Sequence, residues 1–401
     1  MILLDILSYS LFLLLSPLVL YQLFLGVLAR KATIKTSFPA KRKRMFAIIV
    51  PAHNEAKIIA KTIYSIWGIV YPKKFYDLFV IADNCTDNTA EIAKGLGVHV
   101  LERTHKKERG KGYALRWGFD QILKSKKKYD AFIVIDADSL VSGNYLDVMN
   151  HYLENGHRVI QSSDLVLPEE NNWSIEATRI GFLLYNYVKP LGRKVLNLNM
   201  GLRGNGMCFD TGILKAYPWQ AWSLTEDLEY GLILTLKGVR IEFAPEATVW
   251  AQMPLESTNA ASQRSRWEIG RHQVIHEYAR MFLTTSLKRR SFLFFDVFID
   301  LITPPFVNMM VLISLILIPV FILTVTGLFS WLHVSLWGGL LLLGILYLFL
   351  GLYVAKADKM IYKSLLHLPV YIVWKLKVYV NACRSGKETQ WIRTERDGKS
   401  S

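Results

Sequence analysis

The chain has few cysteines, only three among 401 residues. They are far apart in the sequence and lack the short spacing that zinc ligands usually show. A zinc site and a disulfide framework are therefore not expected, and cysteines in a cytosolic domain should be reduced thiols. The three are Cys85, Cys208 and Cys383. No internal repeat is visible, so a repeat architecture is not expected either.

The apolar run from Ile2 to Leu28 lacks the basic start and the short length of a cleavable signal peptide. It is long enough to cross the roughly 30 Å hydrocarbon core of a membrane. We therefore expect residues 1–29 to form an N-terminal transmembrane helix. Two later apolar runs, at residues 306–328 and 331–354, predict a transmembrane hairpin within residues 304–355.

The link between the two later runs has no Lys or Arg, whereas positive charge crowds the exit of the first run. Lys and Arg next to membrane spans collect on the cytoplasmic side. We therefore expect residues 30–45 to be a basic cytosolic linker, with the N-terminus outside. The basic residues are Arg30, Lys31, Lys35, Lys41, Arg42, Lys43 and Arg44.

The formal net charge of +15 raises the question of nucleic-acid binding. Much of the excess lies next to the predicted spans, where anionic lipid headgroups explain it at least as well. No signature of a nucleic-acid-binding fold accompanies the charge. We therefore expect membrane lipids, and no nucleic acid, among the partners of this chain.

From Met45 onward, short apolar runs of the kind found in buried parallel strands alternate with helical segments. This rhythm predicts a doubly wound α/β domain, here assigned to residues 46–255 and to the cytosol. Ligands of such folds gather at the carboxyl ends of the strands. The predicted strands cover residues 45–50, 78–81, 98–101 and 131–135, and the predicted helices cover 56–67, 114–123 and a segment starting at 89.

The segments after this domain predict helices that lie along the membrane surface. Residues 256–303 should hold two helices, 256–282 and 292–302. An aromatic-rich helix is also expected earlier, at residues 175–187. Residues 360–380 mix Lys and Pro with aromatic residues, which favours an interfacial helix over a span. We therefore interpret residues 356–401 as an interfacial helix followed by a cytosolic tail.

Acidic residues follow two of the predicted strands directly. Asp136 and Asp138 come after the fourth strand, where carboxylates can share Mg²⁺ or Mn²⁺ with a diphosphate; an ordinary strand-end turn is the alternative. Asp83 ends another strand, where it suits the imide N–H of uracil or, alternatively, caps the next helix. The first strand is followed by Ala52, His53 and Glu55, which we expect near the base or the ribose.

Further motifs follow in a fixed order, and together they resemble the signature of membrane family 2 glycosyltransferases. This family includes cellulose, hyaluronan and poly-N-acetylglucosamine synthases, and ceramide glucosyltransferase. The resemblance runs from about residue 46 to 270 and implies a GT-A-type nucleotide-sugar-binding domain. The matching motifs are Val50-Pro-Ala-His-Asn-Glu55, the stretch 83–89, Gly110-Lys111-Gly112, Asp136-x-Asp138, Thr225-Glu226-Asp227 and Gln263-x-x-Arg266-Trp267.

The resemblance implies a role for each motif. Asp83 contacts the uracil, and Lys111 assists near the nucleotide. Asp136 and Asp138 hold the sugar diphosphate, with Asp138 nearest the metal. Asp227 is the general base that takes the proton of the acceptor hydroxyl; Glu226 competes for this role.

The same resemblance places Gln263, Arg266 and Trp267 at the acceptor and the diphosphate, although Trp267 can also be read as a membrane-interface anchor. Gly204 and Asn205 resemble a loop that lines the acceptor site. In the tail, Trp391, Arg393 and Thr394 resemble the segment that closes over the nucleotide in hyaluronan synthases. A basic tail that touches lipid headgroups is the alternative. These last residues form the possible gating tail.

The sequence thus predicts an inverting β-glycosyltransferase that moves a sugar from a UDP-sugar to a growing polysaccharide at the cytosolic membrane face. Three predicted spans are few for a polymer channel, so a partner subunit that completes an export path is one expectation. Transfer of a single sugar to a membrane lipid is the other enzymatic reading. A non-catalytic membrane scaffold or nucleic-acid-binding protein would need none of the acidic residues.

Overall fold

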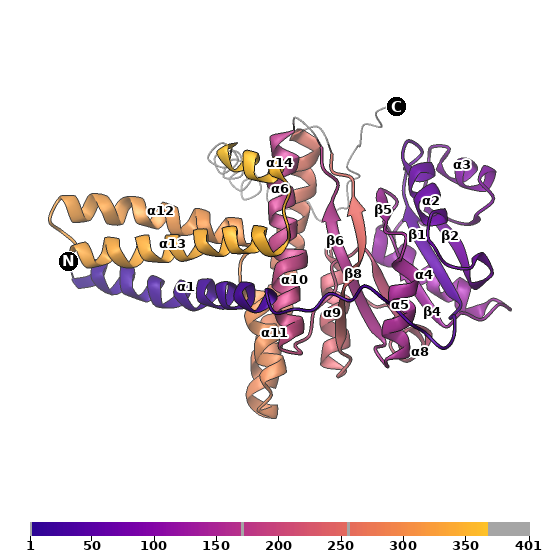
Figure 1. Ribbon diagram of the computed structural model, residues 1–401, viewed down its shortest axis with the longest axis horizontal. Helices are drawn as coiled ribbons and strands as arrows, with labels where there is room; N and C mark the ends of the chain where they lie inside the picture. The colour runs from indigo at the N-terminus through magenta and orange to yellow at the C-terminus, as the bar shows by residue number, and fades with distance from the viewer. Residues whose placement is uncertain (1, 170–171, 255–256, 368–401) are drawn as a thin grey trace. The chain divides into compact units, whose positions relative to one another are not determined.

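The computed structural model describes residues 2–169, 172–254 and 257–367 (Figure 1). The described chain divides into two compact units. One consists of residues 2–32, 176–198 and 281–367, and the other of residues 33–169, 172–175, 199–254 and 257–280.

The second unit is built on one mixed sheet of eight strands in the order β3-β2-β1-β4-β7-β6-β8-β5 (Figure 1). Strands β1, β2, β3 and β4 pair in parallel, which confirms the four strands predicted from the apolar runs. β7 is antiparallel to β4 and β6, and β5 is antiparallel to β8. The strands are β1 (Phe46–Ala52), β2 (Tyr76–Asp83), β3 (His99–Arg103), β4 (Ala131–Val134), β5 (Ser139–Val141), β6 (Val159–Val166), β7 (Met207–Asp210) and β8 (Ile241–Ala251).

Helices connect the parallel strands and bury apolar faces against the sheet. In β1, Ile48 and Val50 are fully buried, and α2 packs Ile59, Ile63 and Ile66 into the same core. Strands that are covered on both faces carry such continuous apolar runs. The helices of this unit are α2 (Ile59–Trp67), α3 (Thr89–Gly95), α4 (Lys111–Lys124), α5 (Tyr145–Glu154), α8 (Thr211–Ala216) and α9 (Glu226–Leu236), with a short 3₁₀ turn at Lys73–Phe75. Helix α10 (Ser257–Arg289) begins in this unit.

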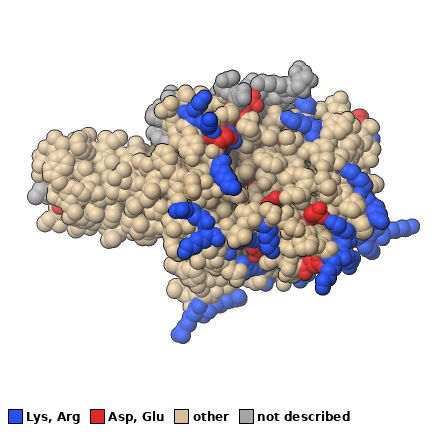
Figure 2. All heavy atoms as spheres, in the orientation of Figure 1, with Lys and Arg blue, Asp and Glu red and all other residues tan. Residues whose placement is uncertain are grey.

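The first unit holds three helices that are long and apolar enough to cross a membrane: α1 (Ile2–Ala29), α12 (Phe306–Val325) and α13 (Trp331–Val354). They run side by side (Figure 1) and share a core that includes Val19, Ile313 and Trp337. On the face that Figure 2 shows, their surface has almost no charged side chains. The predicted span 306–328 ends earlier, because Gly327 takes a positive φ of 76° that stops the helix.

Shorter helices complete the first unit. The helix expected at residues 175–187 is divided in the structure. Helix α6 (Trp173–Phe182), whose first residues belong to the other unit, is followed by a π-helical stretch at Leu183–Val188, which continues into α7 (Lys189–Val195). Helix α11 (Phe292–Ile302) has the predicted bounds. Of the expected helix at residues 360–380, the structure describes α14 (Lys359–Ser364) and a 3₁₀ turn at Leu365–His367; the rest lies outside the described residues.

Four charged side chains form a buried cluster in the first unit. Arg193 of α7 pairs with Asp296 of α11, and both side chains are 1% exposed. Lys189 of α7 pairs with Asp300 of α11, which also lies 3.5 Å from Arg193 Nη1. The hydroxyl of Tyr21 in α1 donates to Asp296. Two positive and two negative charges are therefore compensated within one group, which ties α1, α7 and α11 together.

Candidate active site

Three of the predicted site segments leave the sheet at one edge. Strands β2, β1 and β4 are parallel neighbours, with Ala52 of β1 opposite Ala82 of β2. Their carboxyl ends therefore point the same way. His53 follows β1, Asp83 ends β2 and Asp136 follows β4 closely. The spacing of strands and motifs was sufficient to predict this shared edge.

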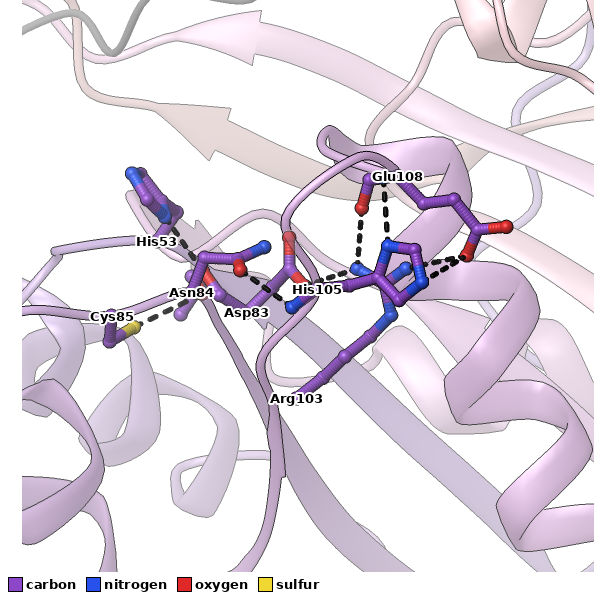
Figure 3. A network of polar contacts seen from close by, with 8 residues as sticks. His53, Asp83, Asn84, Cys85, Arg103, His105 and Glu108 are labelled. Atoms are coloured by element: carbon purple, nitrogen blue, oxygen red, sulfur yellow. Dashed lines mark hydrogen bonds and ion pairs between the residues drawn. The ribbon is translucent and has the colours of Figure 1, made fainter.

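The first cluster at this edge surrounds Asp83 (Figure 3). Arg103, the last residue of β3, donates from Nη1 to Asp83 Oδ1 at 2.7 Å, and both side chains are buried. The same guanidinium donates to the carbonyl and the carboxylate of Glu108, at 2.8 and 3.1 Å. Asp83 Oδ2 makes no hydrogen bond to any residue that the structure describes. Arg103 thus fixes the orientation of the Asp83 carboxylate through Oδ1 and leaves Oδ2 available to accept a hydrogen bond.

Sequence reasoning missed Arg103. The signal that could have found it is positional: β2 and β3 are adjacent parallel strands of the predicted sheet, and Arg103 stands opposite Asp83 in their register. A charged residue that ends a strand beside an acidic strand end is expected to pair with it. The register itself, however, is not visible in the sequence.

The turn after β1 is held by backbone and side-chain contacts with the turn after β2. His53 Nδ1 lies 2.7 Å from the carbonyl oxygen of Asp83, so this nitrogen carries the hydrogen (Figure 3). Asn54 takes a positive φ of 57°, a conformation that asparagine tolerates, and its Oδ1 accepts the N–H of Thr86 at 2.7 Å. The Glu55 N–H donates to Thr89 Oγ1 at 2.8 Å.

The carbonyl of Ala52 accepts the thiol of Cys85 at 3.5 Å. The segment from Ala52 to Glu55 therefore packs against the segment that follows β2.

Lys111 joins two motifs that are far apart in the sequence. Its Nζ lies 2.6 Å from Asp136 Oδ1 and 3.9 Å from Glu226 Oε1, and it donates to the Gly204 carbonyl at 2.5 Å. Burial lowers the pKa of Lys111, but the carboxylates of Asp136, Glu226 and Asp227 outweigh burial and raise it. The ammonium group is therefore charged and balances acidic groups from both motifs.

Asn205 is buried behind the Asp136-x-Asp138 segment. Its Oδ1 accepts the Asp136 N–H at 3.1 Å, and its Nδ2 donates to Ser139 Oγ and to Asp164 Oδ1, at 2.9 and 3.3 Å. Ser139 Oγ in turn donates to Asp138 Oδ1 at 3.0 Å. Asn205, expected to line the acceptor site, thus contacts the residues expected to hold the diphosphate. Its contacts fix the backbone of that segment.

The residues around Asp138 fit a divalent cation. Burial, and then the negative charge of Asp136 and Asp138, raises the pKa of Asp164, so negative charge is crowded here. Among the described residues, no group of three His, Cys, Asp or Glu side chains is arranged to hold a metal ion. Mg²⁺ commonly takes only one or two carboxylates and completes its shell with substrate phosphates and water. A site completed by a diphosphate fits this arrangement.

Glu226 and Asp227 begin helix α9. Burial raises the pKa of Glu226 to about 7; Lys111 opposes this rise and Asp227 adds to it. Burial also raises the pKa of Asp227, against which Lys111, the N–H groups at the start of the helix and Arg203 act. The pair therefore retains one proton more readily than two exposed carboxyls would.

Gly204 lies directly against Asp227. A Cβ atom added to Gly204 would be 2.9 Å from Asp227 Oδ2, and its φ of 83° favours glycine. The structure thus brings the predicted loop at Gly204 to the predicted base. Together with Lys111, this places Asp136, Glu226 and Asp227 around one site.

The Gln263-x-x-Arg266-Trp267 motif lies on α10. Gln263 is buried, whereas Arg266 and Trp267 are half-buried. Gly270, further along the same helix, packs against the loop before α9: a Cβ added there would be 2.8 Å from Thr225 Cγ2 and 3.0 Å from Leu224 Cβ. Gly270 was not among the predicted residues, although it lets the motif helix approach the loop that carries the acidic pair.

A family model described as "Glycosyltransferase like family 2" matches residues 43–270. The chain belongs to glycosyltransferase family 2. This confirms the family and the GT-A-type fold expected from the motifs. The roles of the individual residues stay predictions, and Trp391, Arg393 and Thr394 of the possible gating tail lie outside the described residues.

Individual proteins are similar over large parts of this family 2 chain. The probable glycosyltransferase YdaM of Bacillus subtilis is 26% identical over 302 residues, which are 70% of this chain and 68% of YdaM. The poly-beta-1,6-N-acetyl-D-glucosamine synthase of Staphylococcus aureus is 25% identical over 274 residues, 64% of this chain and 60% of the synthase. The chain thus spans less than two thirds of that synthase.

Among solved structures, the mannosyltransferase PcManGT of Pyrobaculum calidifontis, in complex with GDP-Man and Mn²⁺, shares the fold. Its TM-score is 0.56 at 12% identity, over 96% of this chain and 98% of that chain.

Proposed function

We propose that this family 2 glycosyltransferase moves a sugar from a UDP-sugar to an acceptor hydroxyl, with inversion at the anomeric carbon. The observation that carries the proposal is the position of Lys111, whose Nζ lies 2.6 Å from Asp136 and 3.9 Å from Glu226. An inverting displacement needs a leaving-group site and a proton acceptor on opposite sides of one carbon. Through Lys111, the proposed leaving-group site at Asp136 and the acidic pair that supplies the proton acceptor lie close enough together to serve one sugar.

In the proposed reaction, Asp227 accepts the proton of the acceptor hydroxyl. The hydroxyl oxygen then forms a bond to the anomeric carbon while the bond from that carbon to the diphosphate breaks, and UDP leaves. General-base assistance of this kind is worth about 10²–10⁴ in rate. Arg266 can add a bidentate contact to the diphosphate. Gln263 and Trp267, on the same helix, are proposed to contact the acceptor.

Asp138, together with Asp136, would hold Mg²⁺ or Mn²⁺, which when bound supplies positive charge next to the departing diphosphate. The crowding of carboxylates that raises the pKa of Asp164 supports this assignment. Lys111 is the chain's own cation at the same place and stays charged. Asn205 positions the backbone N–H of Asp136 and thereby the whole segment.

The contacts of Asp83 support uracil as the base of the donor. Arg103 holds Oδ1, and Oδ2 makes no hydrogen bond to a described residue. One available acceptor matches the single imide N–H of uracil. Guanine presents two adjacent donors, N1–H and N2–H, which a carboxylate satisfies with both oxygens. His53 and Glu55 stand next to this position and are proposed to contact the base or the ribose.

We propose a polysaccharide as the first candidate acceptor and place its synthesis at the cytosolic membrane face. The basic residues that follow α1 support this orientation. Similarity to the poly-beta-1,6-N-acetyl-D-glucosamine synthase supports a polymer product. The described residues hold three candidate spans, which are few for a polymer channel. This supports the second candidate, transfer of one sugar to a membrane lipid, or else a partner subunit that completes an export path.

The test is donor-dependent UDP release by the purified, detergent-solubilised protein. UDP-glucose, UDP-galactose and UDP-N-acetylglucosamine, with GDP-mannose as a comparison, are supplied with Mg²⁺ or Mn²⁺ and a lipid extract, and the product is analysed by mass spectrometry. A ladder of products supports the polymer and one glycolipid supports single addition. If no UDP is released from any UDP-sugar, or if Asp227→Asn releases UDP as fast as the unaltered protein, the proposal fails.

A further inference from the structure

Two stacked aromatic rings come from segments that also carry proposed catalytic groups. The rings of Tyr113 and Trp222 have centroids 4.4 Å apart and are inclined by 18°. Trp222 is 43% exposed, and Tyr113 is half-buried. Neither the indole N–H of Trp222 nor the hydroxyl of Tyr113 donates a hydrogen bond to any described residue. The pair therefore offers a flat apolar surface whose polar edges are available to a ligand.

Both residues come from segments that carry the proposed catalytic groups. Tyr113 is in the first turn of α4, which begins at Lys111. Trp222 is in the loop that leads to Glu226, the first residue of α9. Between them, Gly112 packs against the Ala221 carbonyl, and a Cβ added to Gly112 would be 3.4 Å from Glu226 Cβ. The two segments that carry the aromatic pair therefore pack together at Gly112, next to Glu226.

The loop that carries Trp222 is held rigidly. Oε2 of Glu229 accepts the backbone N–H groups of Trp222 and Ser223, at 2.9 and 2.8 Å. Glu229 is buried, and Tyr278 of α10 also makes a hydrogen bond to its carboxylate. A buried carboxylate thus fixes the backbone beneath an exposed aromatic ring. Rigid aromatic side chains bind ligands with little loss of side-chain entropy.

We propose that Trp222 and Tyr113 form a platform that binds a sugar ring of the acceptor next to the hydroxyl that is glycosylated. This inference rests on the proposed function and adds the part of the site that selects the acceptor. A pyranose has an apolar C–H face and a rim of hydroxyls, which match a flat aromatic face with a hydrogen-bond donor at its edge. The nucleobase has its own proposed site at Asp83, so the acceptor is the ligand that remains.

The experiment compares Trp222→Ala, Trp222→Phe and Tyr113→Ala with a matched control, Tyr64→Ala. Tyr64 is 58% exposed and packs edge-on against Trp67 on α2, so its variant removes an exposed aromatic ring from an element that does not carry the platform. The probes are tetrasaccharides of β-linked N-acetylglucosamine, of β-linked glucose and of mannose. Binding is followed by tryptophan fluorescence, and transfer by the KM for the tetrasaccharide and for the UDP-sugar.

We expect Trp222→Ala to raise, by about tenfold, the KM for whichever tetrasaccharide serves as acceptor. The KM for the UDP-sugar should change less than twofold. Trp222→Phe, which keeps a flat ring, should recover most of the loss, and Tyr64→Ala should behave like the unaltered protein.

The platform is refuted if the unaltered protein releases UDP but binds none of the tetrasaccharides. It is also refuted if Trp222→Ala changes the KM of the UDP-sugar as much as that of the tetrasaccharide. An unchanged KM for the tetrasaccharide in Trp222→Ala would refute it as well. Failure of the proposed function itself is distinguishable, because the unaltered protein would then release no UDP from any donor.

Discussion

The carboxyls of Glu226 and Asp227 titrate together, and replacing each by its amide separates their roles. Glu226 has a pKa of about 7, so roughly nine tenths of it carries a proton at pH 6. Burial also raises the pKa of Asp227, but Lys111, the start of α9 and Arg203 oppose that rise. We therefore expect Asp227 to be the ionised base near neutral pH, with the shared proton on Glu226.

This assignment predicts the pH dependence of the reaction. If Asp227 is the base, the unaltered protein should keep most of its kcat at pH 6, and Asp227→Asn should lower kcat by about 10²–10⁴ at every pH. Glu226→Gln, which imitates the protonated form, should keep a kcat within a few-fold of the unaltered protein. The assay is UDP release at saturating donor between pH 5 and 9, with the KM for the donor as a control for the integrity of the site.

The opposite pattern would refute the reasoning. If Glu226 is the base, kcat of the unaltered protein should fall to about a tenth between pH 8 and pH 6, because only about a tenth of Glu226 is then ionised. Glu226→Gln would be the inactive variant, and Asp227→Asn would retain activity. Activity in both variants would show that neither carboxyl accepts the proton.

Four further predictions follow from contacts described above. Asp296→Ala should lower the free energy of unfolding by about 3–5 kcal/mol, because it leaves the Arg193 charge buried without its partner. The double variant Arg193→Met/Asp296→Leu should lower it far less. Thermal unfolding in detergent measures both. Gly270→Ala should lower kcat about tenfold without changing the KM for the donor, since the new Cβ meets the loop before α9; Gly95→Ala, where a Cβ meets nothing within 4 Å, is the control. Arg103→Gln should raise the KM for the UDP-sugar about tenfold, because Asp83 loses its partner in a buried charged pair. An unchanged KM would contradict the proposed uracil-binding role of Asp83. Chelation of divalent cations should suppress UDP release, and added Mn²⁺ should restore it.

Hydrophobic patterning was sufficient to predict much of the fold. The bounds of α11 and α13 agree with the apolar runs, and the four parallel strands follow from runs of buried residues. The antiparallel strands were not predicted individually. β5 and β7 have three and four residues, too few to show a period of two, and their pairing depends on contacts distant in sequence. The π-helical stretch at Leu183–Val188 likewise has no pattern that distinguishes it from an α-helix.

The candidate site shows the same division. Strand ends and motif order predicted that Asp83 and Asp136 lie at one edge of the sheet, because this depends only on strand direction. The partners of these residues depend on register and on packing between segments. The pairing of Arg103 with Asp83, and the place of Asn205 behind Asp136, therefore emerged only from the structure.

The position of Lys111 also constrains how this enzyme can change. One amine serves the carboxylate of Asp136 and that of Glu226, so the electrostatic environment of each depends on the charge of the other. Neutralising Asp136 and Glu226 together should therefore have an effect that differs from the sum of the single changes, as a double-mutant cycle would measure. Because both motifs share Lys111 as their counter-ion, a substitution that changes the charge of one motif also changes the environment of the other. We therefore expect substitutions at the two motifs to occur in compensating pairs.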